Sequence, residues 1–321
     1  MDRTMVVLGG TGFIGREVVA TAVAAGWRVV SFTRSAAGMT HLQQAGATPV
    51  MADLQQPQTW VDTVRNAQMI VDLVQPPLPT RLSLRALQRV SQERQAVTRY
   101  ILQGLAQLPV SERPLLMAIS GVDDLHRSSH RVITEQSPLR TRPQGFGVIG
   151  IPVRHLIAAS GIAATYLYFG TMVYGPGKAF ADRFVTAQIK GNGVIVGAGT
   201  NQLPVTYVTD AARAVVHLAG LPADSLTGQT YVAADGSGVT QAELYQFTAQ
   251  LLGVKGPRRV PAWLANLVGG DQVSHIMGVD ARVAPTKLLA SGFTLHFPTY
   301  REGIPDALRR MALMRDTPPE A

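Results

Sequence analysis

The chain has 321 residues, a length that suits a cofactor-binding domain with a smaller second lobe. Hydrophobic residues make up 46% and charged residues 16% of it, a composition that excludes a disordered or fibrous protein. There is no cysteine, so disulfides and thiolate metal sites are excluded. A chain without cysteine fits a reducing compartment, and we expect a cytoplasmic protein.

The formal charge of +8 raises the question of a nucleic-acid partner. Arg81, Arg85 and Arg89 share one helical face, but no aromatic residues lie between them and no nucleic-acid motif surrounds them. We therefore expect a solvated face and no nucleic-acid binding. The N-terminus lacks the order of segments found in a signal peptide, and no apolar run reaches about 18 residues, so we expect no membrane span.

The first 120 residues alternate short apolar strands with amphipathic helices, which predicts a parallel sheet covered on both faces. Right-handed crossovers would build one doubly wound Rossmann sheet of the α/β class. We expect strands at residues 5–9, 28–33, 48–52, 69–74 and 115–120, and helices at residues 14–25, 39–44, 59–64 and 84–108.

A loop is expected at residues 122–150, which are rich in Arg, Ser, Pro and Gly. We assign residues 1–170 to the cofactor domain, to which residues 205–235 return. Residues 171–204 and 236–321 then form a smaller substrate-binding lobe. Later elements are expected as strands at residues 163–169, 194–196, 205–207 and 230–233 and as helices at residues 152–160, 210–219 and 241–252, followed mostly by short helices.

The strongest motif is a glycine-rich turn between the first strand and the first helix. Gly9 permits a tight turn, Gly12 lets backbone amides approach a pyrophosphate, and Gly15 lets the helix pack on the strand. The helix N-terminus adds free amides and partial positive charge. The predicted dinucleotide-binding residues of this turn are Gly9, Thr11, Gly12, Phe13, Ile14 and Gly15.

The cofactor choice is predicted from the end of the second strand. NAD-binding proteins place an acidic residue there, whereas this chain has Arg34 and Ser35, which can bind a 2′-phosphate. We therefore predict NADP(H). Asp53 and Leu54 are expected beside the adenine, and Val74 along the cofactor nearer the ribose.

These features resemble the extended and atypical short-chain dehydrogenase/reductases, the NAD-dependent epimerase/dehydratase group. The glycine turn looks like that family's cofactor loop, and Ser120 stands at the end of a strand similar to the one that carries its catalytic serine. Residues 173–177 are similar to its VYGPG segment, and residues 206–210 resemble its FVHVDD element. The likeness extends over nearly the whole chain and implies a possible homodimer.

The sequence departs from this family at the catalytic positions. Where the family has a tyrosine and, four residues later, a lysine, this chain has Phe146 and Gly150. Neither side chain can move a proton, so the usual mechanism cannot operate from these positions. Phe169 also replaces an arginine that precedes the VYGPG segment. We expect an apolar substrate pocket made by Ser120, Phe146, Phe169, Met172, Tyr174 and Phe180.

Replacement groups are expected in the loop after the fifth strand. Ser120 can polarise a substrate carbonyl, and His126 and His130 can act as acids near neutral pH. Asp123 and Asp124 bring carboxylates to the same loop, although an exposed polar loop remains an alternative. Their spacing matches no metal motif, so we expect no metal site.

The sequence thus predicts an NADP(H)-dependent oxidoreductase, a reductase of an activated carbonyl, imine or conjugated small molecule that is apolar or aromatic, within a biosynthetic pathway. Two alternatives stay open. One is a redox-neutral isomerase, dehydratase or cyclase on the same fold. The other is a non-catalytic NADP(H)-binding regulator or assembly factor.

Overall fold

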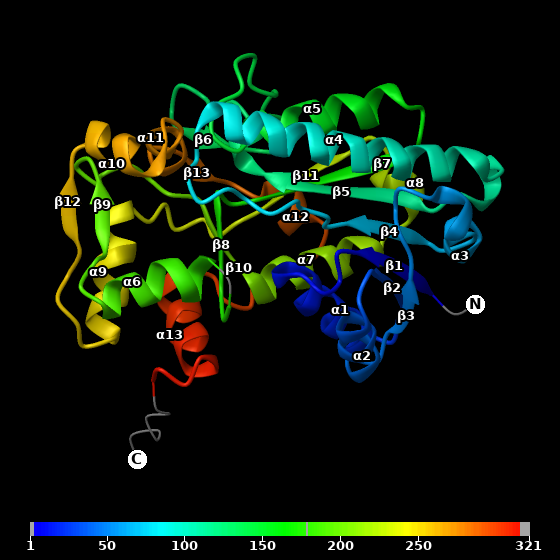
Figure 1. Cartoon of the computed structure of the whole chain (residues 1–321), viewed down its shortest axis with the longest axis horizontal. Helices are drawn as coiled ribbons and strands as arrows, with labels where there is room; N and C mark the ends of the chain where they lie inside the picture. The colour runs from blue at the N-terminus through cyan, green and yellow to red at the C-terminus, as the bar shows by residue number, and fades with distance from the viewer. Residues whose placement is uncertain (1–2, 178, 315–321) are drawn as a thin grey trace.

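Residues 3–177 and 179–314 are described by the computed structural model, which is built around one seven-stranded sheet (Figure 1). All neighbouring strands in the sheet run parallel. The predicted Rossmann-type α/β class is therefore confirmed. In order across the sheet, the strands are β3 (Thr48–Met51), β2 (Arg28–Thr33), β1 (Thr4–Leu8), β4 (Met69–Asp72), β5 (Leu115–Gly121), β7 (Ala164–Phe169) and β11 (Thr230–Ala233).

The strand order reverses between β1 and β4, and this reversal fixes where a ligand can bind. Leu8 at the end of β1 is paired with Phe32 of β2 on one side and with Asp72 of β4 on the other. The loops that follow these three strands therefore leave the same edge of the sheet. In open α/β sheets, ligands bind at such a switch point, outside the carboxyl ends of the strands.

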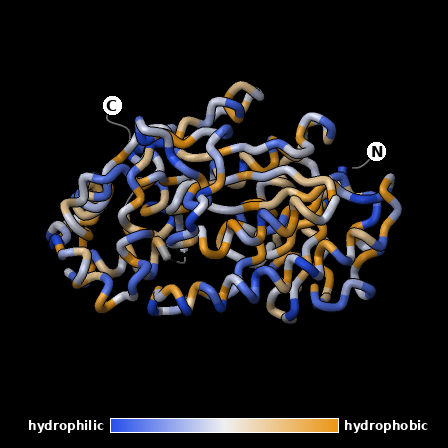
Figure 2. The backbone as a smooth tube through the Cα atoms, turned by 90° about the horizontal axis from the view of Figure 1, so that it is seen from above, coloured by the Kyte–Doolittle hydropathy of each residue, from blue (hydrophilic) through white to orange (hydrophobic). Residues whose placement is uncertain are grey.

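One face of the sheet is covered by α4 (Leu84–Gln107), α5 (Gly147–Ala159) and the short α3 (Val61–Val64). The helix α4 begins where the Ser83 hydroxyl accepts a hydrogen bond from the Ala86 amide at 3.2 Å. Its apolar stripe packs on the sheet while its other face is charged. Figure 2 shows the corresponding alternation of hydrophobic and hydrophilic residues along the helices.

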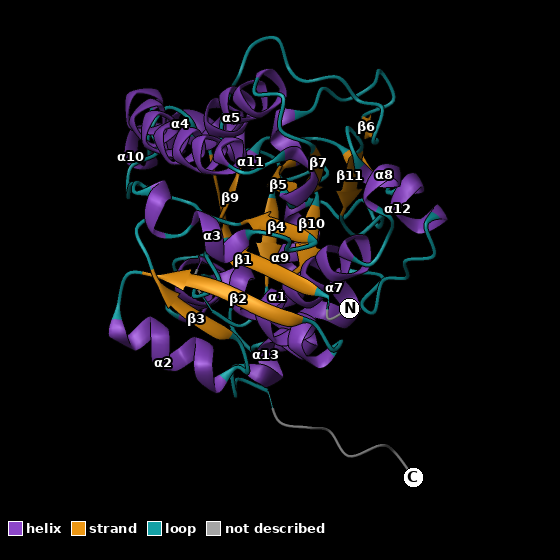
Figure 3. Ribbon diagram, turned by 90° about the vertical axis from the view of Figure 1, so that its right-hand side faces the viewer, coloured by secondary structure: helices purple, strands orange, loops and turns teal. Residues whose placement is uncertain are grey.

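The opposite face is covered by α1 (Phe13–Ala24), α2 (Ala36–Gln44), α7 (Val208–Ala219) and α12 (Thr286–Ala290). Figure 3 shows α4 and α5 on one side of the strands and α1, α2 and α7 on the other. Alternate residues of β1 serve the two cores, with Val6 facing the α4 side and Val7 facing the α1 side. This division explains why the strand is apolar throughout.

The remaining elements gather mainly at the far end of the molecule, around a third, aromatic-rich core (Figure 1). Strand β11 joins the main sheet, whereas β10 (Val205–Tyr207) pairs with β8 (Met172–Tyr174) outside it. The other elements are β6 (Val132–Ile133), a π-helical segment (Ala179–Val185), α6 (Thr186–Ile189), β9 (Val194–Val196), α8 (Ala223–Leu226), α9 (Gln241–Leu251), β12 (Arg258–Val260), α10 (Ala262–Gly269), α11 (Val273–Met277), β13 (Arg282–Val283) and α13 (Tyr300–Arg310), with single 3-10 turns at Pro57–Thr59, Val110–Glu112 and Val122–Asp124.

The predicted loop at residues 122–150 needs a correction. It contains the strand β6, and α5 begins at Gly147, five residues before the expected start at 152. Glycine and proline disfavour a helix, which is why the sequence pattern failed here. Packing overrides that preference, because Val148 and Ile149 are buried against α4. The helix therefore extends over the position of Gly150.

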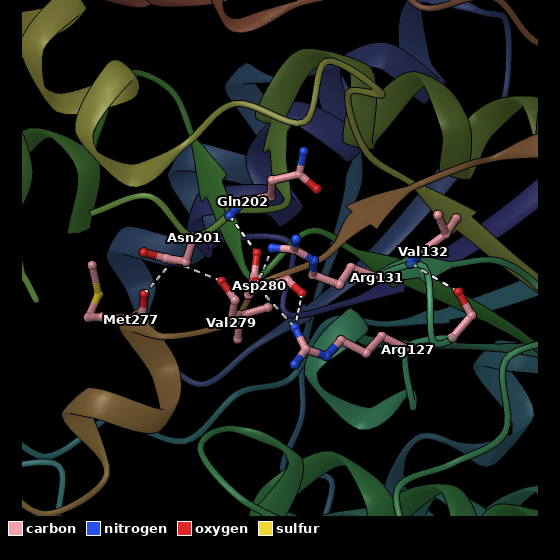
Figure 4. A network of polar contacts seen from close by, with 9 residues as sticks. Arg127, Arg131, Val132, Asn201, Gln202, Met277, Val279 and Asp280 are labelled. Carbon is pink, nitrogen blue, oxygen red and sulfur yellow. Dashed lines mark hydrogen bonds and ion pairs between the residues drawn. The ribbon is translucent and has the colours of Figure 1, made fainter. Parts of the chain in front are cut away.

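A polar network ties this long segment to the second part of the chain (Figure 4). The Asp280 carboxylate lies 3.0 Å from Arg131 and 3.3 Å from Arg127. The same carboxylate accepts a hydrogen bond from the Gln202 amide at 3.0 Å. Beside it, Asn201 donates to the carbonyls of Met277 and Val279. Among the described residues, no helix is both long and apolar enough to cross a membrane.

Candidate active site

The glycine turn joins β1 to α1 at the switch point. Gly9 has φ +81°, and a β-carbon there would lie 2.8 Å from the Leu73 carbonyl oxygen. A β-carbon on Gly15 would overlap the Gly9 carbonyl. Both positions require glycine because the turn is packed tightly against the helix and the neighbouring loop.

Gly12 is less crowded than these two glycines. A β-carbon there would approach only the Gly9 carbonyl oxygen, at 3.1 Å. Gly12 is the N-cap of α1, and neither a side-chain cap nor an acidic residue occupies the first turn of this helix. The first amides of α1 are thus available to an anion. This arrangement fits the pyrophosphate of a dinucleotide.

The end of β2 carries the residues that were predicted to select NADP(H). Arg34 is exposed, and no carboxylate of the described residues pairs with it. Ser35 is the N-cap of α2, where its hydroxyl accepts a hydrogen bond from the Gly38 amide at 3.1 Å. Its own hydroxyl hydrogen remains available to a phosphate. After β3, Asp53 accepts from the Gln55 amide at 3.0 Å, and Leu54 packs against the core.

A cavity of about 310 Å³ opens beside the predicted cofactor site. Ile14 of the glycine turn and Val74 after β4 both line it, so the two sites are continuous. Of the predicted pocket residues, Ser120, Phe146 and Phe169 line this cavity. The space extends from the ends of β5 and β7 to the region beneath α5.

Met172, Tyr174 and Phe180 were also predicted for the pocket, but they do not line this cavity. Tyr174 and Phe180 are buried in the aromatic core, with ring centroids 5.6 Å apart. Burial raises the pKa of the Tyr174 phenol well above its ordinary value. Tyr174 therefore packs as a neutral aromatic residue.

Ser120, near the end of β5, is hydrogen-bonded to a buried carboxyl group. Its hydroxyl lies 2.6 Å from the Asp124 carboxylate, whose residue is only 1% exposed. Burial raises the pKa of Asp124 well above its ordinary value. The hydrogen bond from Ser120 and the charge of Arg140 oppose this rise, whereas the charge of Asp123 adds to it. Burial thus shifts Asp124 toward its protonated form.

Gly150 makes room for this pair. A β-carbon at Gly150 would overlap both carboxylate oxygens of Asp124 and the hydroxyl of Ser120. The position where the resembling family has its lysine is thus closely approached by the serine and the aspartate. No side chain larger than hydrogen fits there without displacing them.

A second carboxyl group, Asp123, lines the cavity next to this pair. It accepts a hydrogen bond from the Thr171 hydroxyl at 3.2 Å. Burial raises the pKa of Asp123 from 3.8 to about 6, although the charge of Arg140 and the hydrogen bond from Thr171 oppose the rise. One carboxyl group, Asp123, thus lines the cavity, and a second, Asp124, lies behind Ser120; burial raises the pKa of both.

The two predicted histidines lie elsewhere. His126 and His130 are exposed and do not line the cavity. The chain turns outward after the buried residues 122–125, and the His126 amide donates to the Pro138 carbonyl at 2.7 Å. The structure thus brings together Ser120, Asp123 and Asp124 but not the histidines.

Sequence reasoning missed the charged residues of the inner cavity. Arg94 of α4 and Asp72 at the end of β4 form a buried ion pair at 2.6 Å. Arg94 also donates to Thr98. The sequence does contain a sign of this ion pair, because Arg94 interrupts the apolar stripe of α4 and Asp72 ends an apolar strand. The other cavity residues missed in this way are Arg154, Tyr166, Tyr168 and Thr171.

The fold and the glycine turn together define a dinucleotide-binding protein of the Rossmann type. Residues 9–127 match a family model described as NAD(P)H-binding. The chain therefore contains an NAD(P)H-binding domain, and its fold is that of the epimerase-type short-chain dehydrogenase/reductases. The family resemblance predicted from the sequence is confirmed at this level.

Two solved structures illustrate the fold. The human epimerase family protein SDR39U1, determined with NADPH, has a TM-score of 0.77 at 19% identity, with 95% of this chain and 99% of that chain covered. A nucleoside-diphosphate-sugar epimerase from Pseudomonas aeruginosa has a TM-score of 0.78 at 15% identity, with 98% and 100% covered. In sequence, an uncharacterized protein of Schizosaccharomyces pombe, C2A9.02, is 28% identical over 220 residues, which cover 65% of this chain and 68% of that protein.

Proposed function

We propose that this protein is an NADP(H)-dependent reductase of an activated carbonyl, imine or conjugated small molecule. One observation carries the proposal. Ser120, hydrogen-bonded to the buried Asp124, lines a cavity that is continuous with the glycine turn. A bound NADPH would supply a hydride, and the residues of this chain would have to bind the substrate and provide the matching proton.

Ser120 and Asp124 are suited to provide that proton. The Ser120 hydroxyl would donate a hydrogen bond, and then its proton, to the substrate heteroatom as negative charge develops there. Asp124, whose pKa burial raises, would in its protonated form return a proton to the Ser120 oxygen across this 2.6 Å contact, the reverse of the direction in which the serine donates to the carboxylate. A buried, neutral carboxylic acid that donates to an oxyanion is a known way of performing this role. Asp124 then regains its proton before the next cycle.

The cofactor preference is proposed from Arg34 and Ser35. A guanidinium group and a hydroxyl can bind a 2′-phosphate through charge-assisted hydrogen bonds. The NADPH in the human structure of similar fold supports this choice. We propose that Gly9, Gly12 and Gly15 hold the pyrophosphate region, with Asp53 and Leu54 beside the adenine.

The walls of the cavity support a small, apolar or aromatic substrate. Phe146, Ile149 and Phe169 line it together with further aliphatic side chains. Its volume of about 310 Å³ lies at the small end of the range for ligand pockets. A single-ring molecule would fill it, whereas a large nucleotide-sugar would exceed it.

The proposal is tested by following NADPH absorbance with benzaldehyde, cinnamaldehyde, naphthoquinone and an aryl imine as probes. We expect oxidation of NADPH with at least one probe, and transfer of deuterium from reduced, deuterated cofactor to the product. Gly12→Val is the matched control, because it should lose the cofactor while retaining the pocket. If NADPH binds tightly but no probe accepts its hydride, the reductase proposal is wrong.

A further inference from the structure

The inner end of the cavity carries a positive charge that the proposed reaction does not use. From Ser120 the cavity extends beneath α5 to Ile157 and Tyr166. Arg154, one helical turn after Gly150, lies on this wall and is partly buried. Because Arg154 lines the cavity, its side chain can contact a ligand that binds there.

The two arginines of the cavity differ in how their charge is balanced. Arg94 is neutralised by Asp72 at 2.6 Å. For Arg154, no carboxylate among residues 3–177 and 179–314 lies at ion-pair distance. A partly buried charge is costly unless an opposite charge or good hydrogen bonds compensate it. The cavity can therefore accommodate one further negative charge beside Arg154.

The guanidinium group of Arg154 is held by aromatic neighbours. Its central carbon lies 3.1 Å from the centroid of the Tyr166 ring, in a close cation–π contact. A guanidinium carries five N–H donors, and one of those of Arg154 is hydrogen-bonded to the Tyr168 side chain, so others are available to a ligand. Tyr168 lies beside it; burial raises the pKa of this phenol, which therefore remains a hydrogen-bond donor.

We propose that Arg154 binds a carboxylate of the substrate, so that the substrate is a small apolar or aromatic carboxylic acid. This inference rests on the proposed function for the role of the cavity as a substrate pocket. The planar guanidinium matches the two oxygens of a carboxylate. With the carboxylate at Arg154, the other end of the molecule would lie at Ser120, near the glycine turn.

A carboxylate suits this site better than a phosphate does. Among the described residues that line the cavity, Arg154 is the one guanidinium without a carboxylate partner, whereas a phosphate dianion has a larger charge and three acceptor oxygens. Asp123 also lines the cavity, and its carboxylate disfavours a second negative charge on the ligand. A molecule with one negative charge and an apolar body therefore matches the positive charge of Arg154 and the apolar walls of the cavity.

The experiment measures binding rather than turnover. Wild-type protein saturated with NADPH is titrated calorimetrically with benzoate, phenylacetate and cyclohexanecarboxylate, each compared with its neutral primary amide, and with phenyl phosphate. At least one acid should bind about tenfold or more tightly than its amide and more tightly than the phosphate. Arg154→Met should abolish this preference and leave the binding of the amide unchanged. Arg154→Lys, which keeps the charge but loses the planar pair of donors, should retain part of it.

Arg99→Met is the control for charge, because Arg99 is exposed on α4 and does not line the cavity. It should leave the preference intact. Circular dichroism and NADPH affinity check that each variant is folded. The proposal is wrong if no acid is preferred over its amide, if the preference survives in Arg154→Met, or if phenyl phosphate binds best. Because no hydride transfer is involved, acids that bind through Arg154 would support this site even if the reductase assay failed.

Discussion

The Ser120 hydroxyl lies 2.6 Å from the Asp124 carboxylate, and both groups occupy the space that a side chain at position 150 would need. The site thus has a serine paired with a buried acid. Burial raises the pKa of Asp124 and Ser120 lines the cavity, so the pair can carry a proton next to it. Five predictions follow from the geometry of the site and its cofactor turn.

Asp124→Asn should lower kcat by about 10²-fold or more, because an amide keeps the shape of the carboxyl but cannot release a proton to Ser120. Ser120→Ala should have a similar effect, and the double variant should be little worse than either single one, since the two residues act as a unit. Turnover and NADPH affinity are measured separately. His126→Ala and His130→Ala are controls that should keep the wild-type rate, because both side chains are exposed. A normal rate in Asp124→Asn would refute the assigned role.

Placing the resembling family's tyrosine and lysine at positions 146 and 150 should not raise turnover. In Phe146→Tyr combined with Gly150→Lys, the new lysine would collide with Asp124 and Ser120. Even Gly150→Ala should reduce turnover and lower the free energy of unfolding by about 1 to 3 kcal/mol, as overpacking of a tight site does. Phe146→Tyr alone is the control, since it adds only a hydroxyl. Denaturant unfolding and turnover test this expectation. Higher activity in the double variant would contradict it.

Arg34→Ala should weaken NADPH binding about tenfold or more and leave NADH binding nearly unchanged. A charge-assisted hydrogen bond to the 2′-phosphate contributes about 1.5 to 3 kcal/mol, and NADH lacks this phosphate. Calorimetric titration with both cofactors measures the ratio. Arg28→Ala removes the same charge at the amino end of β2, the opposite edge of the sheet, and should preserve the preference. If Arg34→Ala and Arg28→Ala weakened NADPH binding equally, the effect would come from the overall charge of the protein and not from a contact with the 2′-phosphate.

Gly12→Val and Gly15→Val should separate binding from folding. The new side chain at position 12 meets one close neighbour, the Gly9 carbonyl oxygen, and occupies the proposed pyrophosphate site, so cofactor binding should be lost and most of the stability kept. At position 15 the first added carbon already overlaps the Gly9 carbonyl, so this variant should be destabilised. Thermal unfolding without cofactor, together with NADPH titration, distinguishes the two effects. Normal NADPH affinity in Gly12→Val would mean that the turn does not hold the cofactor.

Asp123 should make stability depend on pH. Its pKa is about 6 in the folded protein and near 3.8 in the unfolded chain, so between these values only the folded state holds the proton. The free energy of unfolding should therefore fall as pH rises from about 4 to above 6, with up to about 3 kcal/mol of the fall due to Asp123, and the fall should be smaller by this amount in Asp123→Asn, in which Asp124 still contributes. Urea unfolding of both proteins across this range measures the difference. If the two proteins differed in free energy of unfolding by the same amount at every pH, Asp123 would not titrate in this way.

The sequence by itself determined the parallel sheet and the glycine turn at which we propose that the cofactor binds. Alternating apolar strands and amphipathic helices dictate a parallel sheet, and the glycine turn from Gly9 to Gly15 needs only its immediate neighbours to form. The absence of tyrosine and lysine at positions 146 and 150 was equally visible, because residue identity alone decides it. These features are local in sequence, so periodicity and motif spacing suffice to predict them.

Only the tertiary structure decided what surrounds the missing pair. The early start of α5 depends on packing against α4, and this helix places Gly150 over Ser120 and Asp124. Arg154 and Tyr166 come from different elements and meet only when α5 lies on β7. The same loop carries Asp124 into the core and His126 out to solvent, two residues apart. Burial and charge balance arise from contacts between distant segments, and a linear pattern of residue types does not contain them.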